Sequence, residues 1–206
     1  MYGLYNDPDD KVISNQYNDL LQQVDEIYKA FVNVIIPQTP KLAEEFGRIQ
    51  YYGALDLYTD EYLMLSLNQY YIPVAIPMAV TLEAAAQQLI LTEGDRTNLS
   101  DRSSSNIFGA LTPLEQLQAL SLLNQLMINI ADLPEPFQNN PGFILYITSQ
   151  LNMLTTMGYY SEWSGYGSTR LESPNQRRLE MFPISWEQVG YPGPSLGYRA
   201  LRANRS

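Results

Sequence analysis

The sequence predicts an all-α fold: an irregular multi-helix bundle with an extended C-terminal tail rich in Gly, Pro and aromatic residues. Apolar residues recur at helical spacing in several segments, Pro and helix-capping residues separate those segments, and the periodicity fades after Gly158. With 206 residues, 45% of them hydrophobic, the chain is long enough to bury a core. We expect a helical domain over residues 1–157 and an ordered, non-repetitive tail over residues 158–206.

The clearest helical signal is a heptad stripe in the first segment. Apolar side chains alternate at spacings of four and three residues. The helix is expected to begin at Asp7, with Pro8 in its first turn, or later near Ser14, and to end before Pro37. The pattern favours a core helix of a bundle; a dimerising coiled coil is the alternative, although about three heptads is short for one. The stripe consists of Ile13, Tyr17, Leu20, Val24, Ile27, Phe31 and Val34.

The next segments predict shorter helices separated by breaks. Residues 41–61 indicate one short helix or a pair of helices. Residues 62–91 indicate a long buried helical region that Pro73 and Pro77 interrupt. Residues 93–109 are rich in Ser, Asn, Asp and Arg, which predicts a polar loop.

Two later helices have well-marked starts. Thr112, Pro113 and Glu115 occupy the positions of an N-cap, a first-turn proline and a capping-box glutamate. Asn140 is the expected N-cap of the following helix. The first of these helices is predicted to run toward Pro134, and both are predicted to bury an apolar face. Those faces are Leu117, Leu120, Leu123, Met127 and Ile130, and then Phe143, Ile144, Ile147, Leu151, Leu154 and Met157. Met127, Met153 and Met157 are all predicted to lie in the core, where Met commonly fills gaps.

Targeting and membrane signals are weak. The charge-free run from Tyr62 to Leu82 is long enough to cross a bilayer, but its Asn, Gln and Pro residues favour a buried segment without membrane insertion. The acidic start of the chain has no apolar signal-peptide core. We therefore expect a protein that is cytoplasmic or carried by its partner.

Composition excludes most catalytic chemistry within this chain. The absence of His and Cys excludes the usual zinc, copper, haem and iron–sulfur ligands and any Ser-His-Asp triad. The net charge of −10 argues against a nucleic-acid partner. Adjacent acids, such as Asp60-Glu61, predict solvated helix faces more often than a carboxylate pair across a cleft. No catalytic residue, metal site or cofactor site is therefore assigned to this chain.

The tail is the best functional candidate. Residues 1–100 carry 14 acids and 5 bases, a net charge of −9, whereas residues 170–206 carry six Arg and three Glu, a net charge of +3. Trp, Tyr and Arg dominate binding hot spots, so this segment indicates a protein interface; a tail that clamps its own domain is the alternative. The candidate partner-binding residues are Trp163, Tyr166, Arg170, Arg177, Arg178, Trp186, Tyr191, Pro192, Gly193, Pro194, Tyr198 and Arg199.

Two runs in the tail resemble a known family. Met157–Gly167 (MGYYSEWSGYG) and Ser185–Arg199 (SWEQVGYPGPSLGYR) are similar to the C-terminal signature of the gluconate 2-dehydrogenase subunit 3 family. The resemblance extends over Leu111–Leu201, close to half the chain. It implies a helical, non-catalytic small subunit that supports the folding, stability or export of a large flavoprotein. That large partner, an oxidoreductase of the glucose–methanol–choline (GMC) type, would hold FAD and oxidise a sugar or polyol.

One feature departs from the family pattern. Exported members often carry a twin-arginine signal on the small subunit, whereas this chain has no Arg before Arg48. The heptad stripe leaves a second function open, a self-assembling helical structural or scaffold protein, so a homo-oligomer remains possible.

Overall fold

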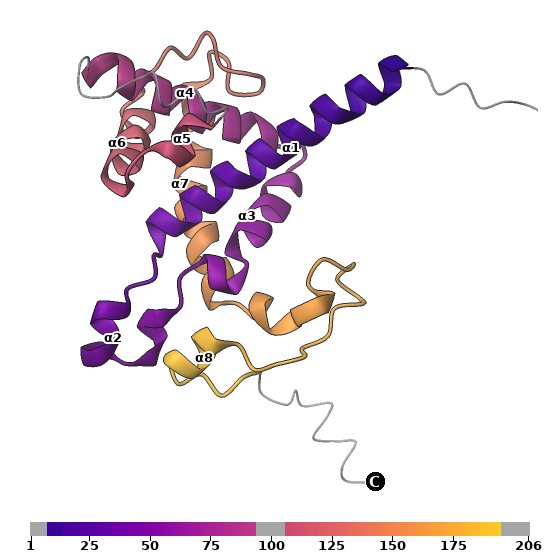
Figure 1. The fold of residues 1–206 in the computed structure, drawn as a ribbon, viewed down its shortest axis with the longest axis vertical. Coiled ribbons are helices and arrows are strands. Elements are labelled where there is room, and N and C mark those ends of the chain that lie inside the picture. Colours follow the sequence, from indigo (N-terminus) through magenta and orange to yellow (C-terminus); the bar gives the residue numbers. More distant parts are fainter. Residues whose placement is uncertain (1–7, 94–105, 195–206) are drawn as a thin grey trace, which may run out of the picture.

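The computed structural model describes residues 8–93 and 106–194 and is all-α: no strand occurs in these residues. The helix α1 (Pro8–Ile35) crosses the molecule diagonally, and its N-terminal half projects from the body (Figure 1). One end of the molecule holds α4 (Ala75–Glu93), α5 (Ile107–Ala110) and α6 (Pro113–Asn124). The other end holds α2 (Pro40–Phe46) and α8 (Ile184–Gln188), and α3 (Thr59–Asn68) and α7 (Pro141–Tyr160) join the two ends.

The long first helix is confirmed with the earlier of its two expected starts, at Pro8, while Asp7 lies outside the described residues. Its C-terminal half forms part of the core, because Val24, Ile27 and Phe31 are buried. Tyr17 is 56% exposed, so the apolar stripe continues beyond the part of the helix that the bundle covers. The helix ends at Ile35, before Pro37 as expected.

One short α-helix, α2, and two 3₁₀ turns follow α1. The turns are η1 (Arg48–Tyr51) and η2 (Leu55–Leu57). After them, α3 ends at Asn68 and a turn containing Pro73 leads into α4. The expected interruption at Pro77 is wrong: Pro77 is the third residue of α4, where its missing N–H needs no helical acceptor.

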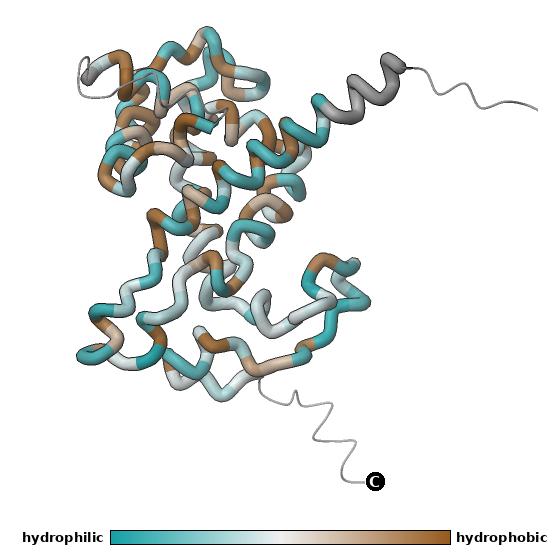
Figure 2. The backbone as a smooth tube through the Cα atoms, in the orientation of Figure 1, coloured by the Kyte–Doolittle hydropathy of each residue, from teal (hydrophilic) through white to brown (hydrophobic). Residues whose placement is uncertain are grey.

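The helix α4 is the core helix of the upper end in Figure 1 and packs against α1, α5 and α6. Residues Ala75–Thr92 are long and apolar enough to cross a membrane by length and composition, but 44% of that stretch is buried inside the protein. Figure 2 shows many apolar residues at this end, whereas pale, hydrophilic and apolar stretches alternate along the C-terminal segment.

The predicted polar loop, residues 93–109, extends too far toward the C-terminus. Residues 94–105 lie outside the described part, but α4 continues to Glu93 and α5 begins at Ile107. The Glu83 carboxylate accepts hydrogen bonds from the backbone N–H groups of Ile107 (2.6 Å) and Phe108 (3.0 Å). This long-range cap satisfies two donors of the helix start and adds to a local cap, in which the Asn106 side chain accepts from the Gly109 N–H at 2.7 Å.

Both marked helix starts are confirmed. Thr112 and Glu115 form the capping box of α6, and the Asn140 side chain caps α7. The expected extension of α6 toward Pro134 is wrong: the helix ends at Asn124, and Leu126 takes a left-handed conformation (φ 56°). The Met127 N–H then bonds back to the Leu122 carbonyl, a helix-ending arrangement that normally uses Gly or Asn in place of Leu126.

The prediction that three Met residues lie in the core is wrong. Met127 follows the end of α6 and is 56% exposed. Met153 and Met157 lie on the side of α7 away from Ile144, Ile147 and Leu151, and about half of each is exposed. Leu117 of the predicted α6 face is also exposed. Apart from Leu117, Met127 and Met157, the side chains of the two predicted faces are buried or half-buried.

Candidate interaction surface

The C-terminal segment 161–194 leaves the end of α7 and covers one end of the body (Figure 1). It contains a 3₁₀ segment, η4 (Trp163–Thr169), and the short helix α8. The preceding helix α7 continues to Tyr160, three residues beyond the boundary expected after residue 157. Close approach of α7 to α3 requires Gly158, because a Cβ there would lie 2.5 Å from the Tyr62 ring.

Trp163 fixes the first part of the segment. Its side chain is 2% exposed, and its indole N–H donates to the Tyr58 carbonyl at 2.8 Å. The ring meets Tyr62 edge to face, with centroids 5.5 Å apart. The acceptor carbonyl belongs to a residue in the left-handed conformation (Tyr58, φ 55°) just before α3. A buried ring and a satisfied indole N–H together make this a structural anchor.

Arg170 forms a second anchor. Its Nε and Nη2 reach the two carboxylate oxygens of Glu61 at 2.5 and 2.8 Å, and Nη1 donates to the Gly167 carbonyl at 2.8 Å. The guanidinium also lies 3.8 Å from the centroid of the Tyr58 ring. The Glu61 carboxylate raises the pKa of Arg170 further above its ordinary value. Because both partners are mostly shielded from water, this bidentate pair is stronger than an ordinary surface ion pair.

The loop between η4 and α8 is closed by Glu180. Its carboxylate accepts from the backbone N–H of Ser168 (2.8 Å) and from the Ser168 hydroxyl (2.7 Å), and these bonds lower its pKa. Gly167 beside this contact has φ 51°, and a Cβ there would overlap the Glu180 carboxylate. Only glycine fits both the backbone angle and the space.

Trp186 fixes the last part of the segment. It is 6% exposed, and its indole N–H donates to the Tyr160 carbonyl at 3.0 Å. Phe182 and Tyr191 meet its ring edge to face, with centroids 5.7 and 4.9 Å away. Both of these neighbours are about half exposed, so they form an aromatic surface over a buried indole.

The structure distributes the candidate partner-binding residues over three environments. Trp163 and Trp186 are buried in their own chain, as the self-clamping alternative expects for these two side chains, and their role in partner binding stays a prediction. Tyr166, Arg170, Arg177 and Gly193 are half-buried, and Arg178, Tyr191, Pro192 and Pro194 are exposed. Tyr198 and Arg199 lie outside the described residues.

Sequence reasoning missed the apolar side chains that the segment exposes, apart from Tyr191. They are between 43% and 66% exposed, a large apolar surface for a segment of this length. No periodicity marked them, because the segment has little regular structure. We call this set, together with Arg177 and Arg178, the tail surface; its apolar members are Leu171, Leu179, Met181, Phe182, Val189 and Tyr191.

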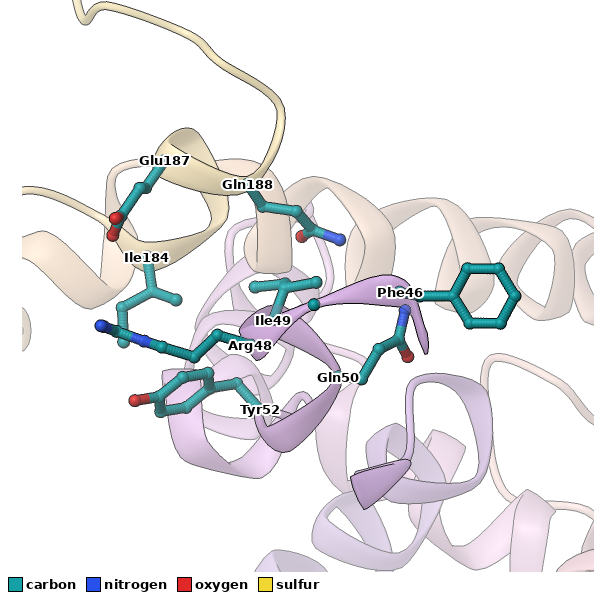
Figure 3. A pocket seen from close by; sticks show the side chains of 9 residues that line it. Phe46, Arg48, Ile49, Gln50, Tyr52, Ile184, Glu187 and Gln188 are labelled. Carbon is teal, nitrogen blue, oxygen red and sulfur yellow. The ribbon is translucent and has the colours of Figure 1, made fainter. Parts of the chain in front are cut away.

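A cavity of about 420 Å³ lies between η1 and α8. In Figure 3, Arg48 and Tyr52 lie on one side of it and Glu187 and Gln188 on the other, while Phe46 points away. No ion pair within the described residues joins Arg48 to Glu187. The cavity can accept a small polar group, and its lining brings together no residues arranged for nucleophilic catalysis.

The remaining buried titratable groups serve the fold. The Tyr159 hydroxyl donates to the Tyr52 carbonyl at 3.0 Å, and burial raises its pKa to about 12. Burial also raises the pKa of Asp60 in the first turn of α3. Among the described residues no group of acids has a geometry that could hold a metal ion.

Comparison with family models, with curated proteins and with solved structures finds no match to this chain. The all-α fold therefore rests on the structure itself.

Proposed function

We propose that this chain is a non-catalytic small subunit that binds and stabilises an FAD-dependent sugar or polyol dehydrogenase of the GMC type. Two sequence features support the proposal: the resemblance of the tail runs to the subunit 3 family, and the absence of the His and Cys side chains that most catalytic sites use. FAD would be held by the large partner, with no cofactor in this chain.

One structural observation carries the proposal: the tail surface is exposed and apolar, yet its backbone is fixed. Trp163, Trp186 and the Arg170–Glu61 pair hold the segment on the body. A surface held in one conformation loses little entropy on binding, so more of its contact energy appears as affinity. The two Trp residues therefore position the surface, and the exposed aromatic and Arg side chains make the contacts.

The chemistry of the tail surface indicates the kind of partner face. Phe182, Val189 and Tyr191 offer apolar contacts around Trp186, and Arg177 and Arg178 add positive charge. We expect an apolar patch with acidic residues at its rim on the flavoprotein, and a complex that forms more slowly at high salt.

The direct test is co-expression with a GMC-type oxidoreductase from the same genome, followed by pull-down and flavin absorbance of the complex. Val189→Asp and Arg178→Glu alter the tail surface without touching its anchors. Each should reduce recovery of the flavoprotein, whereas Leu114→Asp, a similarly exposed apolar position on α6, should not. A parent chain that fails to retain the flavoprotein would refute the proposal.

A second function is favoured by a separate observation. The projecting half of α1 exposes Tyr17 of the heptad stripe and Leu21 beside the stripe, as a self-assembling scaffold protein would require. Light scattering of the isolated chain distinguishes the two. A large assembly formed without a partner supports the scaffold, and a species of one or two copies opposes it.

A further inference from the structure

The helix α7 has an exposed face without charge. None of its 20 residues is Asp, Glu, Lys or Arg, although the chain carries a net charge of −10. A solvated helix face normally carries charged residues, whereas interface cores are depleted of Lys, Glu and Asp and enriched in Tyr and Met. The exposed face consists of Leu145, Tyr146, Ser149, Asn152, Met153, Thr156, Met157 and Tyr160.

The order of residues on this face fits a second copy of itself. Tyr146, Met153 and Tyr160 follow one another at intervals of seven residues and so form one stripe. If two α7 helices pair in antiparallel fashion about an axis at Met153, Tyr146 of one copy meets Tyr160 of the other. In the same register the small Ser149 lies opposite the large Met157. Large residues facing small ones allow two helices to interdigitate.

Two hydroxyls of the face are already satisfied within the helix. The Ser149 hydroxyl donates to the Tyr146 carbonyl at 2.7 Å, and the Thr156 hydroxyl donates to the Asn152 carbonyl at 3.0 Å. Covering these two hydroxyls therefore leaves neither donor unpaired.

The aromatic ends of the face are also held in place. Tyr70 and Phe143 contact the ring of Tyr146, and Tyr159 contacts the ring of Tyr160. Pairing would therefore immobilise few free rotamers.

We propose that a second copy of this chain docks on the exposed face of α7, with the two α7 helices antiparallel across a two-fold axis at Met153. An uncharged face suits self-association of an acidic chain, because it adds no like-charge contact at the axis. The stripe spans about 21 Å of helix, which is too short to bury the roughly 1,000 Å² of a stable interface by itself. The dimer is thus reversible at micromolar concentrations and strengthens with salt, which screens the repulsion between the two acidic bodies.

Light scattering across a concentration series tests the proposal. The parent chain should pass from monomer to dimer, and Met153→Glu should raise the dissociation constant at least about tenfold, because two carboxylates then face each other at the axis. Met153→Lys should do the same, and an equal mixture of the two variants should dimerise again. Leu114→Glu adds the same charge at an exposed apolar site on α6 and should leave the dimer unchanged.

The absence of native Cys allows a second test that does not depend on affinity. Met153→Cys should form a disulfide with its own copy under a glutathione redox buffer, and Leu114→Cys should not. A parent chain that stays monomeric throughout, a dimer that persists in Met153→Glu, or a mixture of Glu and Lys variants that stays monomeric would each overturn the proposal.

Discussion

The helical body and the C-terminal segment are held together in different ways. The body shares one continuous core in which side chains such as Leu63, Leu82 and Leu123 are fully buried. The segment 161–194 contributes few residues to that core and is held at separate points: two indole N–H bonds, one bidentate ion pair and one carboxylate that closes a loop.

Because of this difference, mutations should destabilise the two regions in different ways. A core held by apolar area loses stability as a whole when one side chain is truncated, because its contacts are shared. A segment held by directional contacts can detach locally while the body stays folded. If the tail surface acts in partner binding, it can therefore be disabled without unfolding the protein.

The largest expected effect comes from Trp163→Ala. The change removes a buried ring and the hydrogen bond to the Tyr58 carbonyl, at a cost of about 3–5 kcal/mol to attachment of the segment. Trypsin should then cut after Arg177 or Arg178 much faster than in the parent. Far-ultraviolet circular dichroism should show that the body helices persist.

The matched control is Leu82→Ala in the body, which should lower the free energy of global unfolding by about 2–5 kcal/mol. Urea unfolding separates the two variants. If Trp163→Ala lowers the global transition as much as Leu82→Ala does, the segment and the body form one cooperative unit and the contrast fails.

Arg170→Met should have the next largest effect. It leaves the half-buried Glu61 carboxylate without its guanidinium partner, and we expect a loss of about 1–3 kcal/mol in attachment of the segment. Arg170→Lys should recover only part of it, because Lys cannot form the bidentate pair. The double variant with Glu61→Gln measures the coupling energy, and a value near zero would show that the pair contributes nothing.

Gly167→Ala tests the loop that Glu180 closes. The added Cβ meets the Glu180 carboxylate and forces a non-glycine residue into a positive φ, for an expected loss of about 1–2 kcal/mol. Gly142→Ala, in the open first turn of α7, should instead be neutral or slightly stabilising. Proteolysis of the segment in both variants gives the comparison; equal rates would mean that this turn does not constrain the segment.

The fold was predictable where the signals are local. The capping box at Thr112 and the cap at Asn140 each use neighbouring residues, so a single sequence contains them in full. The end of α6 was not predictable, because Leu126 adopts a conformation that Leu rarely takes. The burial of Met153 and Met157 was mispredicted because α7 has no charged residue, so its outer face carries Met and Tyr beside Ser and Thr and is not clearly marked as exposed.

The candidate surface was predictable only as a segment. Buried anchors and partner hot spots both favour Trp, Tyr and Arg, so composition cannot separate Trp163, which is buried, from Tyr191, which is exposed. What decides is long-range pairing, such as the contact of Arg170 with Glu61. Contacts between residues that far apart in the chain leave no pattern in one sequence.

The smallest effect concerns Asp60, a body residue beside the Arg170–Glu61 anchor. Asp25, Lys29, Glu61 and Arg170 are its charged neighbours, and burial is the largest cause of its raised pKa. Because the folded state holds this proton to higher pH than the unfolded chain does, ionisation of Asp60 opposes folding. That penalty grows as pH rises from the ordinary Asp pKa to the folded one and is complete above it. Asp60→Asn should therefore be slightly more stable than the parent at pH 7, by less than any change above, and the difference should vanish in acid. Urea midpoints at both pH values measure it, with exposed Asp19→Asn as the control. A variant less stable than the parent at pH 7 would mean that the ionised carboxylate stabilises the start of α3. A charged contact would then help to hold the body as well as the C-terminal segment, and the contrast between the two regions would fail.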